Sequence, residues 1–135
     1  ILREWFGLAD GLARTFNGSA LCWAPGAVVL GLDRLGDYLD AWDARNEVPV
    51  ALLATFRRTL DGAVQSNGLG FFTGQEFRIE PQLVNGDEDA LARPLFRHLF
   101  YAGRQEKTGQ LAAPGGFALR LEPSENRRFV RVWPG

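Results

Sequence analysis

The sequence predicts a single α+β domain in which one mostly antiparallel sheet of five or six strands is covered by two or three helices. Three observations lead to this prediction. The chain has 135 residues, which is an ordinary size for one domain. Its strand-like segments come in adjacent pairs between amphipathic helical segments, as in antiparallel α+β proteins. No internal repeat or low-complexity segment divides residues 1–135.

Three segments carry apolar residues at helical spacing. The apolar stripe of the first consists of Trp5, Leu8, Ala9, Leu12 and Phe16. Asn17-Gly18 follows it and predicts that the helix ends there with a residue in the left-handed conformation. The second helix covers Asp33–Arg45, with Asp33 as its expected N-cap. The third runs from a cap at Asp87 to about Ala102, with Pro94 inside it, which predicts a kink or a fresh start.

The strands are predicted from short apolar or alternating segments. Val48–Phe56 is almost wholly apolar and predicts a central strand buried on both faces. Turn signals at Asp61-Gly62 and Ser66-Asn67-Gly68 flank a weak segment. The remaining expected strands are Ala20–Trp23, Ala27–Leu30, Phe77–Glu80, Phe117–Leu121 and Arg128–Trp133. The last two form a C-terminal hairpin with one buried face.

Composition excludes several function classes. The net charge of −1 argues against sequence-independent nucleic-acid binding, which needs a surplus of positive charge. No apolar run reaches the ~20 residues that a membrane helix needs, so no membrane partner is expected. The single cysteine, Cys22, excludes an internal disulfide and a cysteine-rich zinc site. A lone thiol favours a reducing, cytoplasmic location. Because the chain starts at Ile1 and lacks methionine, we expect it to be excised or trimmed from a longer protein.

The segment Ser66–Phe77 resembles the signature of an uncharacterised bacterial family, the domain of unknown function number four-two-six-one. That signature reads Thr-x-Gly-Leu-x-x-Phe-Gly-x-x-Glu-Leu, and this chain has Ser66, Thr73 and Phe77 where the family has threonine, glycine and leucine. The resemblance extends over about Leu8–Trp133. It implies a bacterial origin and a similar order of elements, and it brings no known activity.

The glycine-rich segment 66–76 is the main candidate site. Its proposed binding residues are Gly68, Phe71, Thr73 and Glu76. Glycines permit positive φ and close approach to a ligand, and Glu76 would be the polar anchor. The alternative, which we favour, is a structural loop whose amides Glu76 satisfies. The spacing matches neither a phosphate loop nor a dinucleotide fingerprint.

The remaining candidates are isolated residues. His98 is the only histidine, and we include it among the possible binding residues, although a boundary position on the third helix is the favoured interpretation. Cys22 lies in an apolar strand and is read as a small buried hydrophobe. The arginines of the terminal hairpin could face an oligonucleotide, an interpretation that we do not favour. No metal, cofactor or catalytic residue is predicted.

These observations favour a non-catalytic bacterial module that binds another protein, in an accessory, immunity-like or regulatory role. The absence of any cluster of nucleophile, base and stabilising donor leads to this hypothesis. The alternative is a small hydrolase-type enzyme with its site at the glycine-rich loop 66–76.

Overall fold

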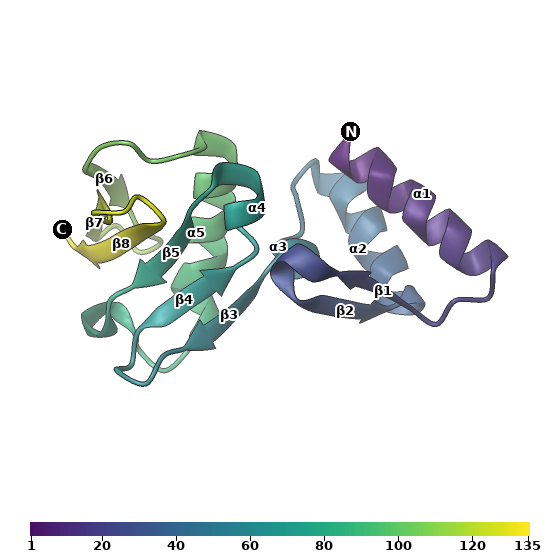
Figure 1. Ribbon diagram of the computed structural model, residues 1–135, viewed down its shortest axis with the longest axis horizontal. Helices are drawn as coiled ribbons and strands as arrows, with labels where there is room; N and C mark the ends of the chain where they lie inside the picture. Colours follow the sequence, from purple (N-terminus) through teal and green to yellow (C-terminus); the bar gives the residue numbers. More distant parts are fainter.

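The computed structural model describes all 135 residues, which form two adjoining lobes (Figure 1). The first lobe consists of α1 (Leu2–Thr15), β1 (Ala20–Trp23), the 3₁₀ turn Ala24–Gly26, β2 (Val28–Gly31) and α2 (Leu32–Arg45). The second consists of α3 (Val50–Leu53), β3 (Thr55–Arg58), β4 (Val64–Asn67), α4 (Gly70–Thr73), β5 (Glu76–Ile79), the 3₁₀ turn Pro81–Leu83, α5 (Asp89–Ala102), β6 (Gly109–Ala112), β7 (Ala118–Pro123) and β8 (Phe129–Pro134). The α+β fold class is therefore confirmed.

The strands form two sheets, so the prediction of a single sheet is wrong. β1 and β2 form a hairpin of their own, and the six other strands are ordered β3-β4-β5-β8-β7-β6. All pairings are antiparallel except that of β5 with β8, where Phe77 lies beside Val130 and Ile79 beside Val132. The parallel pair arises because α5 and the β6–β7 hairpin intervene between β5 and β8 in the chain.

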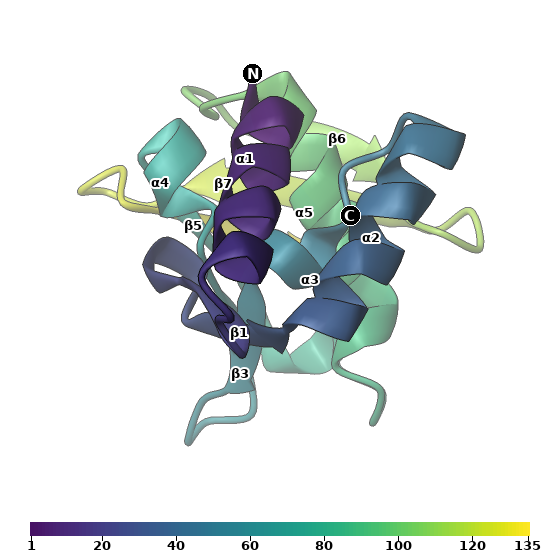
Figure 2. The ribbon, with the colours of Figure 1, turned by 90° about the vertical axis from the view of Figure 1, so that its right-hand side faces the viewer.

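Each sheet has its own helical cover. α1 and α2 lie side by side on the small hairpin at one end of the molecule (Figure 2). α5 covers one face of the large sheet with Ala92, Leu95, Phe96 and Leu99, all buried. The opposite face of that sheet carries polar side chains such as Gln65 and Arg78. None of the helices has the length and apolarity that crossing a bilayer requires.

The apolar segment Val48–Phe56 is not one strand. Pro49 precedes a single helical turn, in which Leu52 N donates to Pro49 O at 3.0 Å and Ala54 N donates to Val50 O at 3.0 Å. Only after Ala54 does the chain extend into β3. A short, wholly apolar run has no periodicity that separates a buried helix from a buried strand, which is why the sequence pattern misleads here.

Further sequence expectations are corrected. The turn expected at Ser66-Asn67 lies within β4, where Ser66 pairs with Phe56. β6 was not predicted, and it pairs with β7 at the edge of the sheet. Asp33 lies within the first turn of α2, whose N-cap is Gly31 without a side-chain hydrogen bond. The N-cap of α5 is Glu88 and not the expected Asp87, although Asp87 accepts a hydrogen bond from Asp89 N at 3.0 Å.

One cluster of 24 buried apolar residues includes members of both lobes. Aromatic members of this cluster and two partly buried phenylalanines packed against it, Phe72 and Phe100, connect the lobes. Phe6 of α1 lies 5.5 Å from Trp23 of β1, measured between ring centroids, and Trp23 lies 6.1 Å from Phe72 of α4. Phe72 in turn contacts Phe100 of α5 at 4.9 Å. The short helix α4 therefore packs between the two lobes.

The backbone is most crowded at the Leu53 carbonyl group. A Cβ atom on Gly26 would lie 2.0 Å from Leu53 O, and one on Gly68 would lie 2.3 Å from it. Gly68 also has a φ of 126°, a backbone angle that residues with a side chain rarely adopt. Thr55 Oγ1 adds a hydrogen bond to Gly26 O at 2.8 Å. Glycine is required at both positions because the two lobes meet backbone to backbone.

Replacing Gly68 by alanine should destabilise the protein strongly. The new methyl group would overlap the Leu53 carbonyl and strain the backbone, and we expect a loss of about 3 kcal/mol in the free energy of unfolding. Gly11→Ala is the matched control, since nothing lies within 4 Å of its Cβ position in α1. That change should stabilise the helix by roughly 0.5–1 kcal/mol. Denaturant unfolding measures both, and equal stabilities of the two variants would contradict this account.

Candidate functional site

The glycine-rich segment connects β4 to β5 through the single turn of α4. Gly68 precedes α4, Phe71 and Thr73 lie within it, and Gly74 ends it in the left-handed conformation with a φ of 76°. Glu76 is the first residue of β5. Four of the five predicted site residues therefore belong to one continuous loop.

Both carboxylate oxygens of Glu76 are occupied by donors of that loop. Oε1 accepts hydrogen bonds from Gly68 N at 2.9 Å and Gly70 N at 2.8 Å. Oε2 accepts from Ser66 Oγ at 2.5 Å and Leu69 N at 3.2 Å. Three consecutive backbone N–H groups facing one carboxylate form an anion-binding nest. Here the anion is the protein's own side chain, which favours the structural interpretation of the loop.

The neighbouring polar side chains also serve the loop. Ser66 Oγ accepts a hydrogen bond from Phe77 N at 2.9 Å. Thr73 Oγ1 accepts from Gln75 N at 3.2 Å and lies 3.3 Å from Leu69 O. Beside Glu76 lies a wholly polar hollow of about 280 Å³, lined by Thr55, Arg57, Gln65, Ser66, Asn67 and Glu76.

Gln75 is a residue that the sequence did not single out. Its side chain is buried, and its amide nitrogen donates to Gln105 O and Arg127 O, both at 3.1 Å. Its amide oxygen accepts from Gln105 N at 2.8 Å. Gln75 thus ties the glycine-rich loop to the segment after α5 and to the turn before β8. Nothing in the local sequence separates such a glutamine from an exposed one.

His98 does not join the loop. It is exposed on α5 and lines hollows formed by residues such as Leu91, Pro94 and Tyr101. The polar hollow at Glu76 contains neither His98 nor any other residue of α5. The structure also contains no group of three or more histidine, cysteine or carboxylate side chains placed to share a metal ion. Cys22, expected to be buried, is exposed.

The helix α1 presents an apolar face to solvent. The apolar side chains that it buries or half-buries are those of Leu2, Phe6, Ala9 and Ala13. The apolar stripe predicted from the sequence is shifted by about one residue around the helix from this buried face. Its large side chains are exposed: Trp5 by 53%, Leu8 by 63%, Leu12 by 50% and Phe16 by 78%. We call these four residues the α1 stripe. Two apolar stripes can be read along this helix, and the sequence prediction chose the outward one.

Phe71 continues this surface onto α4. Its ring is 63% exposed and lies 5.2 Å from Trp23, which in turn lies 6.1 Å from Trp5. If each large apolar side chain has roughly 150–250 Å² of surface, the α1 stripe and Phe71 together leave about 500–600 Å² accessible. That is near the upper limit of roughly 600 Å² for the largest apolar patch of a typical monomer.

An ion pair and a hydrogen bond connect α1 to α2. Arg3 Nε and Nη2 donate to the two carboxylate oxygens of Asp43 on α2, at 2.9 and 2.8 Å. The Arg3 guanidinium thereby lowers the pKa of the Asp43 carboxyl group. Arg14 Nη2 donates to Leu32 O at 3.0 Å. Both arginines face α2, so the α1 stripe is held away from the lobe.

Carboxylates accompany most arginines of the C-terminal hairpin. Arg127 pairs with Glu106 at 2.9 Å, and Arg131 pairs with the buried Glu80 at 2.8 Å. Arg120 lies 3.8 Å from Glu122. Neutralised guanidinium groups attract phosphates weakly, so this geometry does not favour the oligonucleotide hypothesis.

No family model matches the chain, and neither the curated proteins nor the solved structures compared with it contain a match. The resemblance to the bacterial family of unknown function therefore stays a prediction.

Replacing Glu76 by glutamine should lower stability. The amide group would turn an N–H₂ donor toward donors of the loop, and we expect a loss of about 2–3 kcal/mol in the free energy of unfolding. Glu122→Gln is the control, because Glu122 makes only a long, half-exposed ion pair, and it should change stability by less than ~0.5 kcal/mol. If Glu76→Gln abolishes a binding or hydrolytic activity at unchanged stability, Glu76 is functional rather than structural.

Asp61 should make folding sensitive to acid. Hydrogen bonds from Arg78 and then Thr59 lower its pKa from 3.8 to about 2. A pKa that is lower in the folded state gives stability that is present above pH ~4 and is lost as the pH falls toward 2. Asp61→Asn should flatten the pH dependence of unfolding in that window. An NMR titration midpoint of the Asp61 carboxyl near 3.8 in the wild type would contradict this prediction.

Proposed function

We propose that this chain is a non-catalytic bacterial interaction module, in an accessory, immunity-like or regulatory role, and that another protein docks on the α1 stripe and Phe71. One observation carries the proposal: the four large apolar side chains of the α1 stripe are each at least half exposed, although Phe6 of the same helix is fully buried. Exposed patches of this size mark interaction sites more often than chance.

The size of the patch fits a protein partner. Its roughly 500–600 Å² is a large part of the ~800 Å² that each side of a standard interface buries. Trp5 and Phe71 are residue types that act as anchors in interfaces. The Arg3–Asp43 pair holds the helix in place, which reduces the ordering cost of binding.

The hydrolase alternative receives less support. A general base must have a free lone pair within reach of a substrate proton. Glu76 already accepts four hydrogen bonds, and the only histidine lies outside its hollow. The polar lining of that hollow, which includes Arg57, is the one feature that favours this alternative.

Polar substitution of the α1 stripe should weaken partner binding without unfolding the protein. The double variant Leu8→Gln/Leu12→Gln keeps helix propensity and removes two exposed apolar side chains. We expect partner affinity to fall about 10- to 100-fold, with stability changed by less than ~1 kcal/mol. Wild-type and variant chains serve as baits against lysate of the source organism, and the affinity of each recovered partner is then measured by calorimetry.

Leu60→Gln is the matched control, because Leu60 is fully exposed on the β3–β4 turn, far from the α1 stripe in sequence. It should bind the partner as the wild type does. Size-exclusion chromatography with light scattering separates a second outcome, in which the stripe joins two copies of this chain. Equal affinities of the wild type and the double variant would contradict docking on α1.

A further inference from the structure

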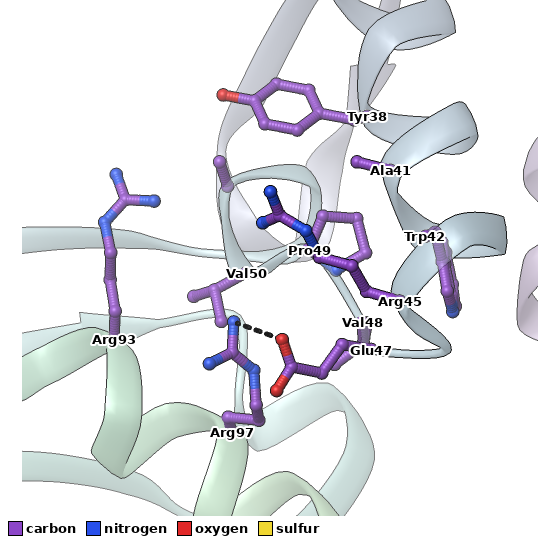
Figure 3. Close-up of a pocket in the computed structure, with 11 residues that line it drawn as sticks. Tyr38, Ala41, Trp42, Arg45, Glu47, Val48, Pro49, Val50, Arg93 and Arg97 are labelled. Carbon is purple, nitrogen blue, oxygen red and sulfur yellow. Dashed lines mark ion pairs between the residues drawn. The ribbon is translucent and has the colours of Figure 1, made fainter.

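Several arginine side chains line a cleft between the two lobes. Its inner part has a volume of about 220 Å³ and lies between α2, the linker before α3, and α5 (Figure 3). A second hollow of about 390 Å³ shares Tyr38, Ala51 and Arg93 with it, so the two hollows adjoin, and we call them together the arginine cleft. Four guanidinium groups line this cleft, from Arg34, Arg45, Arg93 and Arg97. Glu47 and Asp89 are its only carboxylates, in a chain whose net charge is −1.

Two of these arginines, Arg45 and Arg97, are incompletely neutralised. Arg45 takes part in none of the ion pairs of the chain. Arg97 Nη2 lies 3.9 Å from Glu47, too far for a hydrogen bond, and its Nε is buried without any partner. Arg93 is paired, with Asp89 of its own helix, at 2.9 Å. A buried donor without an acceptor is costly, so the protein itself stabilises the Arg97 guanidinium incompletely.

The arginines also repel one another. Arg93 and Arg97 are four residues apart on α5, where like charges destabilise a helix. Arg45 comes from the last turn of α2 in the other lobe and lines the same hollow (Figure 3). Residues of different elements thus line one hollow, and the apolar side chains of Trp42, Pro49 and Val50 lie among them. Such a site suits a small ligand with an anionic head and an apolar body.

We propose that this cleft binds a small organic oxyanion with at least two negative charges, a phosphoryl or dicarboxylate compound, through Arg45, Arg93 and Arg97. Guanidinium groups present paired N–H donors that match the oxygen geometry of both anion types. The site is separate from the α1 stripe and does not depend on the proposed function.

Titration of the folded chain with inorganic phosphate and, separately, with succinate tests the proposal at low ionic strength. NMR follows the guanidinium Nε–H signals of the arginines. We expect saturable shifts of Arg93 and Arg97, and about tenfold weaker binding in each of the variants Arg45→Gln and Arg97→Gln. Stronger binding of phosphate identifies the phosphoryl class, and stronger binding of succinate identifies the dicarboxylate class.

Arg128→Gln is the control of equal charge change, because Arg128 is an exposed arginine of the β7–β8 turn outside the cleft. Its affinity for either anion should equal that of the wild type. Thermal unfolding of every variant without ligand shows whether each one is folded. The proposal is overturned if neither anion gives a saturable shift of Arg93 or Arg97, or if all three variants bind alike.

Discussion

The contact of two glycines with the carbonyl group of Leu53 is the constraint on which the arrangement of this molecule depends. Gly26 belongs to the small hairpin and Gly68 to the loop that leads into α4, and both approach the same oxygen too closely to carry a side chain. The Glu76 carboxylate then holds the loop by three backbone amides. With the loop fixed, Phe71 and Phe72 meet Trp23, and the aromatic core continues from one lobe into the other.

The orientation of α1 follows from polar and apolar contacts together. Arg3 and Arg14 donate hydrogen bonds to α2, and Leu2, Phe6, Ala9 and Ala13 lie on the side of α1 that faces the lobe. A helix with two apolar stripes can bury only one of them against a two-stranded hairpin. The stripe with the larger side chains is therefore left at the surface, which is unfavourable for an isolated chain in water.

Segments whose apolar residues recur at a regular spacing could be predicted from the sequence, and segments without such a spacing could not. The three 14-residue helices were expected because their apolar residues recur every three or four positions. Val50–Leu53 has no polar residue to reveal its period, and the pairing of β5 with β8 depends on contacts 53 positions apart in the chain. The hydrogen bonds from the loop amides to Glu76 agree with the structural role that the sequence analysis favoured for this residue. The arginine cleft was missed because Arg45 and Arg97 come from different lobes.

The backbone junction at Leu53 has a consequence for recognition. Hinged two-lobed proteins adjust the width of the space between their lobes to the molecule they enclose. In this protein, Gly26 of the first lobe already lies against the Leu53 carbonyl group of the second lobe, and Thr55 Oγ1 of the second lobe donates a hydrogen bond to Gly26 O. The two lobes therefore have little room to move closer together around a ligand. If the cleft between the lobes binds a small anion, its selectivity would then depend on the width that the cleft already has, and the lobes would rearrange little on binding or release.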